Sequence, residues 1–423
     1  MKTSPDKQRL FALDVVQKLR AAGYESYWAG GCVRDQLLGI APKDYDVATI
    51  ATPEQVQELF GRRRTLPIGA AFGVICVVGP KGAGQIEVAT FRQDLGYTDG
   101  RRPDAVAYCS AKEDALRRDF TINGLFYDPT QEQIIDFVDG QKDLAARLVR
   151  AIGDPAHRFE EDKLRMLRAV RFASTFDFTL DPATADVIRR MASEVTVVSA
   201  ERIAVEMEKM LVHPNRTVAL RLLRETKLLD VVLPELTTFL ETHPDRLEPT
   251  LTILSQLKPI EVEPTNGEDR SAMATAMATL LREAVDAETI ARIGRRWKLT
   301  NRVINRAAWL LKHQEMIRSA TSLRWSELQP ILIEPGIADL LCMADAVATV
   351  EPDLQPAIAH CRERLALPPE ELNPTPLLDG NDLLRLGLQP GPNLGRLLAQ
   401  IRTAQLDAQI STKEEALWIV EKQ

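Results

Sequence analysis

The 423-residue chain has few aromatic residues and few cysteines, and it has no long apolar run. Its five cysteines are scattered and lack the paired spacing of a metal site, so we expect reduced thiols in a cytoplasm. No apolar run approaches the roughly 18 residues that a membrane span needs, and the first residues lead into an amphipathic helix pattern, not a signal peptide. The composition therefore predicts a soluble, cytoplasmic, globular protein that contacts no membrane.

Other features are also missing. The histidines are dispersed and form no His-Asp pair, which argues against a phosphohydrolase domain. There is no internal repeat. The net charge of −7 argues weakly against a nucleic-acid partner, but arginines cluster at 62–64, 101–102, 117–118 and within 292–306. Phosphate attraction depends on the local field more than on the total charge. For any one cluster, a solvated helix face is the simpler interpretation.

Secondary-structure signals change along the chain. Up to about residue 145, short apolar runs alternate with turns and predict an α/β domain. Thr52 is a good cap for a helix over Pro53–Phe60. From residue 155 onward, helical periodicity dominates. The predicted strands are 25–29, 45–48, 73–78, 85–91, 124–127 and 133–137, and the other predicted helices include 1–22, 163–175, 182–192, 201–211 and 216–226.

Two carboxylates stand one residue apart at the start of a predicted strand. On a strand, Asp44 and Asp46 would share one face, with Tyr45 on the other. Hard oxygen ligands so placed suit a pair of Mg²⁺ ions. Glu87, a charge inside a β-branched run, is the best candidate for a third ligand. Taken alone, Asp-x-Asp usually marks a surface turn, and Glu87 would be an edge-strand charge.

Two further segments suit phosphate and ribose. The pair Gly30-Gly31 lies between a predicted strand and an amphipathic segment, where glycines let the backbone approach phosphate oxygens. An ordinary tight turn is the alternative. Farther along, Arg117 and Arg118 stand beside Asp119: arginine can bind phosphate bidentately, and a carboxylate can accept from a ribose hydroxyl. A helix cap with a surface ion pair is the alternative there.

A third segment, 161–165, suits base selection. Asp162 and Arg165 are three residues apart in a predicted helix, so we expect them to share one helix face, supported by Glu161. The Asp162 carboxylate would be a hydrogen-bond acceptor beside the donors of the Arg165 guanidinium. Adenine and cytosine fit this pair, because each places an exocyclic amine next to a ring nitrogen that accepts. Guanine and uracil have the reverse order of donor and acceptor, so the pair disfavours them. A plain intrahelical salt bridge is the more common meaning of an isolated Asp-x-x-Arg.

Taken in order, these stretches resemble the class II (bacterial-type) tRNA nucleotidyltransferase and poly(A) polymerase family, most of all its CCA-adding members. The combination is specific, although each piece is weak alone. The matching segments are 30–39 with 44–46, 88–92, 99–104, 117–123, 136–143, 153–155 with 158–159, 161–172 and 199–203, with looser matches at 297–301 and 376–395.

The resemblance implies an α/β head (1–145) with a polymerase-β-like nucleotidyltransferase sheet. An all-α neck (146–215) with the nucleotide-selecting helix, a body (216–345) and a tail (346–423) would follow. It also implies template-independent addition of C and A nucleotides, from CTP and ATP, to the 3′ end of tRNA, by two-metal transfer that releases pyrophosphate. The implied metal ligands are Asp44, Asp46 and Glu87, and the implied nucleotide-binding residues are Gly30, Gly31, Arg34, Arg118, Asp119, Asn123, Asp162, Arg165 and Arg168. Arg118 would hold the triphosphate and Asp119 would sense the 2′-OH; no protein partner is evident.

Alternatives stay open within and outside this family. Family members that add only CC lack a flexible loop in the segment equivalent to residues 92–117. This segment is full length here, which argues against such an enzyme. Residues 66–74 resemble the tRNA enzymes more than the poly(A) polymerases. Addition of the terminal A alone, or poly(A) synthesis, is not excluded. A non-catalytic helical RNA-binding protein would have lost Asp44 or Asp46, and both are present in this chain. A small-molecule nucleotidyltransferase would keep the metal site but would lack the selecting helix and the long helical body.

The basic stretch 292–306 is the candidate RNA-binding surface. Four of its cations recur at three- or four-residue spacing and could form one stripe along a helix, although Gly294 and Thr300-Asn301 could interrupt it. These four are Arg295, Lys298, Arg302 and Arg306. A merely solvated helix face is nearly as good an interpretation.

Overall fold

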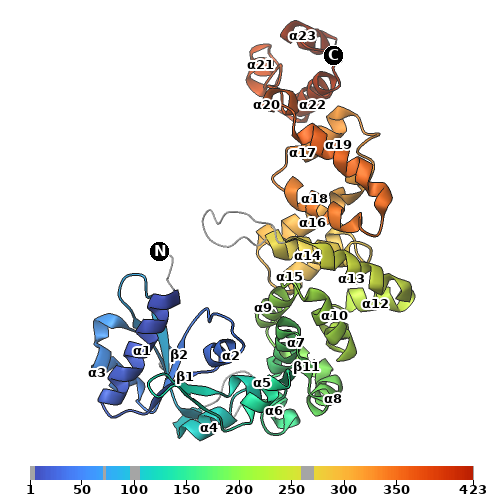
Figure 1. Cartoon of the computed structure of the whole chain (residues 1–423). Helices are drawn as coiled ribbons and strands as arrows, with labels where there is room; N and C mark the ends of the chain where they lie inside the picture. Colours follow the sequence, from blue (N-terminus) through green and yellow to red (C-terminus); the bar gives the residue numbers. More distant parts are fainter. Residues whose placement is uncertain (1–4, 70–72, 96–104, 259–270, 423) are drawn as a thin grey trace. The chain divides into compact units, whose positions relative to one another are not determined.

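The computed structural model describes residues 5–69, 73–95, 105–258 and 271–422 (Figure 1). The chain divides into two compact units, Met1–Pro234 and Glu235–Gln423. Of the segments used above, 99–104 lies wholly outside the described residues, and 66–74 and 92–117 lie partly outside them. The predicted class, an α/β head followed by helices, is confirmed. The four-part division of the chain at 145, 215 and 345 stays a prediction.

A seven-stranded mixed sheet organises the first unit, in the order β3-β4-β5-β2-β1-β8-β9. Among the described strands of this sheet, β2 and β5 are the one pair that runs parallel. A separate hairpin joins β6 and β7, and a short parallel ladder joins β10 and β11. The strands are β1 Ser26–Ala29, β2 Asp46–Thr49, β3 Thr65–Gly69, β4 Val74–Val78, β5 Gln85–Thr90, β6 Arg92–Leu95, β7 Ala105–Tyr108, β8 Phe126–Asp128, β9 Gln133–Ile135, β10 Leu148–Val149 and β11 Thr179–Leu180.

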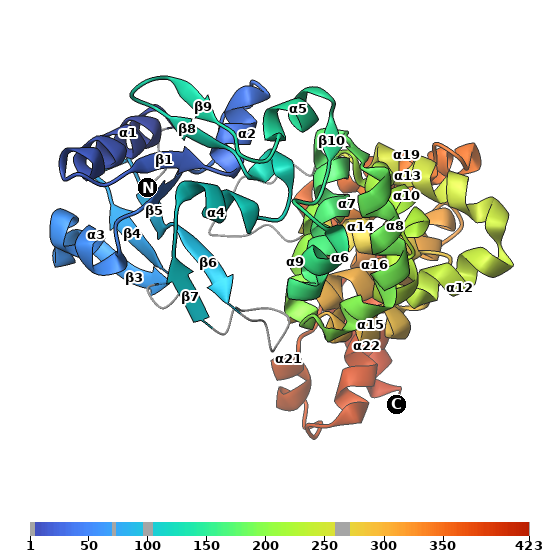
Figure 2. The ribbon, with the colours of Figure 1, turned by 90° about the horizontal axis from the view of Figure 1, so that it is seen from below.

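Alternation along the strands determines which side chains enter the larger core of the first unit. In β5, Ile86 and Val88 are buried while Gln85 and Glu87 are exposed. The buried set joins Val47, Ile75 and Val77 in a core with residues of α1 and α3, which cover that face (Figure 2). Because side chains alternate between the faces, Asp46 and Glu87 point away from this core.

Local sequence explains why α3 begins where it does. Its bounds, Pro53–Phe60, are those predicted, and the Thr52 hydroxyl accepts from the Gln55 N–H while the Gln55 side chain accepts from the Thr52 N–H. This capping box satisfies two N–H groups that a helix start otherwise leaves without partners. In α1, Phe11, Val15 and Leu19 pack inward, whereas Leu10 is 60% exposed.

Helices make up most of the rest. None of the described helices is long and apolar enough to cross a membrane. In the first unit they are α1 Pro5–Ala21, α2 Gly31–Leu37, α3, α4 Ala111–Leu116, α5 Gly140–Ala145, α6 Pro155–Glu161, α7 Leu164–Phe176, α8 Pro182–Met191, α9 Ala200–Leu211, α10 Arg216–Glu225 and α11 Leu228–Val232. They continue with α12 Pro234–Thr242, α13 Leu247–Gln256, α14 Ser271–Leu281, α15 Ala287–Arg296, α16 Asn301–Arg318, α17 Trp325–Leu332, α18 Ile337–Val347, α19 Gln355–Leu365, α20 Pro369–Leu372, α21 Gly380–Arg385, α22 Pro392–Leu406 and α23 Lys413–Glu421.

Candidate active site

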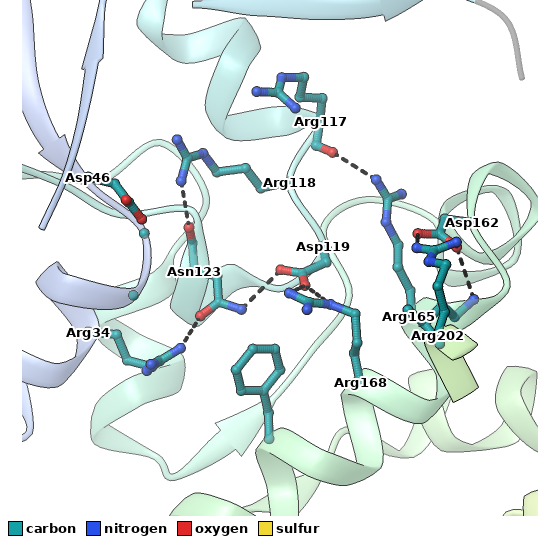
Figure 3. Close-up of a pocket in the computed structure, with 14 residues that line it drawn as sticks. Arg34, Asp46, Arg117, Arg118, Asp119, Asn123, Asp162, Arg165, Arg168 and Arg202 are labelled. Atoms are coloured by element: carbon teal, nitrogen blue, oxygen red, sulfur yellow. Dashed lines mark hydrogen bonds and ion pairs between the residues drawn. The ribbon is translucent and has the colours of Figure 1, made fainter. Parts of the chain in front are cut away.

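A cavity of about 570 Å³ opens beside Asp46 in the first unit (Figure 3). Its walls come from the β1–α2 turn, the segment after α4, the α6–α7 junction and α9. Six arginines and three aspartates line it, so its charge is strongly positive and suits a polyanion such as a triphosphate. The lining residues are Gly30, Gly31, Arg34, Asp46, Arg117, Arg118, Asp119, Asn123, Asp162, Leu164, Arg165, Arg168, Phe172 and Arg202.

The glycine turn brings the backbone close to an arginine. Gly30 has φ 70°, a conformation that glycine adopts readily, and α2 begins at the next residue. A Cβ atom at Gly30 would lie 2.9 Å from Nη1 of Arg118, the same nitrogen that donates to the Asn123 carbonyl at 3.3 Å. Glycine at position 30 therefore suits the positive φ of the turn and leaves room for Arg118 in this position.

Arg117 and Arg118 are held by one buried acid that the sequence analysis missed. Asp114 is 1% exposed; its Oδ1 accepts from Arg117 Nη2 at 2.6 Å and its Oδ2 accepts from Arg118 Nη2 at 3.0 Å. Burial would raise the pKa of Asp114, but the two guanidinium groups outweigh burial and lower it. The acid lies three and four residues before the arginines on α4, which is the spacing that could have predicted it.

A relay of polar side chains crosses the floor of the cavity. Arg34 Nη1 donates to Asn123 Oδ1 at 2.6 Å, Asn123 Nδ2 donates to Asp119 Oδ1 at 3.0 Å, and Arg168 donates to Asp119 Oδ2 at 2.7 and 2.9 Å (Figure 3). Burial would raise the pKa of Asp119, but Arg168 and the Asn123 hydrogen bond lower it to about 2. Asp119 therefore stays ionised. Because its oxygens also accept from the Phe120 N–H, the carboxylate already has four donors in this structure.

The expected helix face shared by Asp162 and Arg165 is wrong. Asp162 follows the last residue of α6 in an extended conformation, with φ −149° and ψ 104°, and Arg165 belongs to α7. The break occurs because Asp162 caps the new helix by accepting from the Leu164 N–H at 3.1 Å. Both residues still line the same cavity, so the acceptor and the donor fork are brought together by the helix junction.

Each member of this pair has its own anchor. Arg202 of α9 donates to the two oxygens of Asp162 at 3.1 and 2.7 Å. Glu161 forms a short ion pair with Arg165 and also accepts from Arg158 at 2.8 Å. Glu161 does not line this cavity, and its supporting role stays a prediction. Sequence reasoning missed Arg202 because it lies forty residues from Asp162 in the chain.

The predicted metal ligands lie at the edge of the cavity. Asp46 lines it, and Glu87 is its register partner on the neighbouring strand β5. Asp44 lies in the bend just before β2 and is exposed, and neither Asp44 nor Glu87 lines the cavity. Although Asp46 is accessible to solvent, protein atoms crowd around it and raise its pKa to about 6, with further contributions from Glu87 and Asp44 and opposition from Arg118.

The carboxylates suit hard cations, but they are not assembled into a complete ligand set. Among the described residues, no group of three or more His, Cys, Asp or Glu side chains meets the geometry of a metal site. A cation here would have to complete its coordination with substrate oxygens and water. Such open coordination is usual for magnesium.

The candidate RNA-binding cations lie in the second unit and do not form one stripe. Helix α15 ends at Arg296, and α16 begins at Asn301, so Arg295 and Arg302 are on different helices. Both are exposed and form no ion pair with any residue of the described ranges. Lys298 lies in the connection, with φ 52°. Arg306 is half-buried and its Nε lies 3.5 Å from the buried Asp339 carboxylate, so it serves the core of this unit.

Family models match most of the chain. They are described as "Poly A polymerase head domain" (residues 26–150), "Probable RNA and SrmB- binding site of polymerase A" (177–240) and "tRNA nucleotidyltransferase domain 2" (269–420). The chain belongs to the tRNA nucleotidyltransferase and poly(A) polymerase family. The predicted family is thus confirmed, and membership implies a nucleotidyltransferase that uses a divalent metal ion.

Individual relatives are similar over nearly the whole chain. The CCA-adding enzyme of Anoxybacillus flavithermus is 35% identical over 408 residues, which cover 96% of this chain and 95% of the relative. The CCA-adding enzyme of Limosilactobacillus reuteri is 33% identical over 414 residues, which cover 96% and 94%. A solved structure of the Bacillus stearothermophilus CCA-adding enzyme in complex with CTP matches with a TM-score of 0.75 at 29% identity, over 97% of this chain and 96% of that one.

Proposed function

We propose that this nucleotidyltransferase adds C and A nucleotides, taken from CTP and ATP, to the 3′ end of tRNA. One observation carries the proposal: a single cavity joins an arginine-rich cradle, an Asp162–Arg165 hydrogen-bonding edge and the Asp46 carboxylate. The cradle suits a triphosphate, the edge suits adenine or cytosine, and the carboxylate suits a catalytic cation. The full-length similarity to enzymes named for CCA addition supports the same assignment.

The metal ion of this site is proposed to be Mg²⁺, bound by Asp46 and Glu87 with help from Asp44. Two observations support this metal. All three candidate ligands offer carboxylate oxygens, and the pKa of Asp46 is raised, because burial by protein atoms and the neighbouring Glu87 and Asp44 carboxylates disfavour its charged form. A bound cation would relieve that repulsion. When bound, the metal ions would activate the attacking 3′-OH and neutralise charge on the departing pyrophosphate.

The protein's own groups orient the nucleotide. Arg118, held in place by Asp114, would bind triphosphate oxygens beside the Gly30-Gly31 turn. Asp162 would accept from the exocyclic amine of the base, and Arg165 would donate to its ring nitrogen. Asp119 is fully engaged, so we propose that it acts mainly by orienting Arg168 and Asn123; a contact with the 2′-OH would require one of its present donors to leave.

Product analysis tests the proposed function. The purified protein is incubated with tRNA ending at the discriminator base, with CTP alone, ATP alone or both, and the products are resolved by length. We expect CC addition with CTP alone and CCA with both nucleotides. Extension only of tRNA already ending in CC would indicate an A-adding enzyme, and long tails with ATP would indicate a poly(A) polymerase. No extension under any condition would contradict the proposal.

A further inference from the structure

Arg158 of α6 donates hydrogen bonds to three backbone carbonyls and a carboxylate, although it does not line the candidate nucleotide cavity. Its Nη2 donates to the Leu116 carbonyl at 2.8 Å, and its Nη1 donates to the Arg117 carbonyl at 3.1 Å. Its Nε donates to the Ile152 carbonyl at 3.2 Å, and Nη1 also donates to Glu161 at 2.8 Å. The side chain is only 12% exposed and lines a separate cavity of about 300 Å³. Any effect of Arg158 on a bound nucleotide therefore passes through these partners.

The Arg158 guanidinium caps the end of α4. The last carbonyls of a helix lack partners within that helix, and a cation placed there also complements the negative end of the helix dipole. Helix α4 ends at Leu116, with Arg117 as its C-cap residue. The Arg117 carbonyl and the Arg118 N–H belong to one planar peptide unit, so a donor that holds this carbonyl also holds the start of Arg118. Arg158 thus orients the backbone from which the proposed triphosphate ligand extends.

The same carbonyl also holds the arginine that is proposed to read the base. Arg165 Nη2 donates to the Arg117 carbonyl at 3.4 Å (Figure 3), and Arg165 Nη1 donates to the Arg158 carbonyl at 3.0 Å. A carbonyl oxygen has two lone pairs, so the Arg117 oxygen can accept from Arg158 and Arg165 together. Glu161 closes the arrangement, because its carboxylate accepts from both guanidinium groups. One peptide oxygen is therefore the common attachment point of the phosphate cradle and of the base-reading donor.

We propose that Arg158 is a positioning residue that sets the distance between the phosphate cradle and Arg165. A nucleotide is bound at both ends at once, so a shift of one end relative to the other misplaces the base even when each end is intact. Arginine suits this role because its planar fork reaches several acceptors in fixed directions, whereas lysine offers a single charged point. The inference rests on the proposed function and adds to it a residue that contacts neither the base nor the phosphates.

The test is Arg158→Lys in the full chain, which keeps the charge but loses the fork. The preference for CTP over UTP is measured as the ratio of their kcat/KM values with tRNA ending at the discriminator base. We expect this preference to fall about tenfold, which is within the usual worth of one base contact. Inhibition by inorganic tripolyphosphate should keep the parental Ki, because Asp114 still holds the side chains of Arg117 and Arg118. An unchanged preference, or equal losses of kcat/KM with CTP and UTP, would overturn the positioning role.

Arg189→Lys is the matched control. Arg189 Nε likewise donates to the carbonyl of the last residue of another helix, Glu225 of α10, at 3.1 Å, but Arg189 lines neither cavity. We expect its base preference to equal that of the unaltered enzyme. A second comparison adds Arg158→Lys to Arg165→Gln: since Arg158 acts through Arg165, the double variant should discriminate no less than Arg165→Gln alone. A further loss of discrimination would overturn the inference.

Melting temperatures show whether Arg158→Lys stays folded. If it does not fold, Glu161→Gln takes its place, because this change removes the carboxylate that joins the two guanidinium groups and leaves the bonds of Arg158 to α4 in place. The same fall in CTP preference is expected, and an unchanged preference overturns the inference. An unaltered enzyme that adds no nucleotide to tRNA would refute the proposed function and this inference together, whereas an active enzyme whose variants keep the parental preference refutes the inference alone.

Discussion

Asp119 stabilises the first unit through its charge, and Asp119→Asn removes that charge while keeping the side-chain volume. Burial would raise the pKa of Asp119, but Arg168 and Asn123 lower it from 3.8 to about 2. This depression corresponds to about 2 kcal/mol of unfolding free energy at pH 7. The Asp119 side chain is only 10% exposed, so solvent screens the interaction little.

The sign of the pH dependence follows from the depressed pKa. A carboxylate whose pKa is lower in the folded state stabilises that state above the unfolded pKa, near 3.8, and loses the contribution as the pH falls through about 2. About half of it remains at pH 3. We therefore expect Asp119→Asn to destabilise the first unit by about 2 kcal/mol at pH 7 and by about 1 kcal/mol at pH 3.

Hydrogen exchange during a urea titration measures this difference locally. Exchange of peptides covering residues 118–126, recorded at pH 7 and at pH 3, gives the unfolding free energy of the segment that contains the relay. Asp177→Asn is the control, because Asp177 is 70% exposed and its partner Arg147 is 61% exposed, so we expect almost no change. Equal losses for Asp119→Asn at both pH values, or a variant as stable as the parent, would refute the electrostatic argument.

Three other predictions concern activity. Asp46→Asn should abolish nucleotide addition with little change in melting temperature, and turnover near the parental rate with Mg²⁺ would refute a metal-binding role. Arg202→Gln should release Asp162 and raise incorporation of UTP or GTP relative to CTP and ATP about tenfold, since a mispaired edge costs about 1–3 kcal/mol; strict base choice at reduced activity would instead indicate a structural pair. Arg295→Glu combined with Arg302→Glu should raise the KM for tRNA and flatten its salt dependence without changing the KM for ATP, whereas unchanged tRNA affinity would identify a merely solvated surface.

Much of the fold could be predicted from the sequence, because local sequence patterns determine where these helices and strands begin and end. The Thr52 cap and Pro53 start determined α3 to the residue, and the short apolar run over 85–91 predicted β5. The edge strand β3 was not predicted, because Leu66-Pro67-Ile68-Gly69 contains a proline, which weakens a strand signal. An edge strand tolerates Pro67 because one side of its backbone needs no partner.

The site was predictable in its residue types but not in its pairings. Ten of the residues expected to bind nucleotide or metal line one cavity. The failure at Asp162 and Arg165 has a physical cause: helical spacing finds partners three or four residues away, and here an aspartate that caps α7 interrupts the helix. Its actual partner, Arg202, is brought near by the packing of α7 on α9, which no local pattern encodes.

Independent anchoring of Asp162 and Arg165, the two groups proposed to read the base, would matter for selection without a template. A template base would present a complete set of hydrogen-bonding groups to the incoming nucleotide. Here only two side chains, Asp162 and Arg165, would take that place, and each would move freely without a partner to hold it. Arg202 of α9 fixes the acceptor, while Glu161 at the end of α6 fixes the donor fork. Because the anchors belong to different helices, losing either one displaces half of the edge and leaves the other half in place. Under the proposed role, discrimination between bases would therefore depend on helix packing as much as on the two groups that would touch the base.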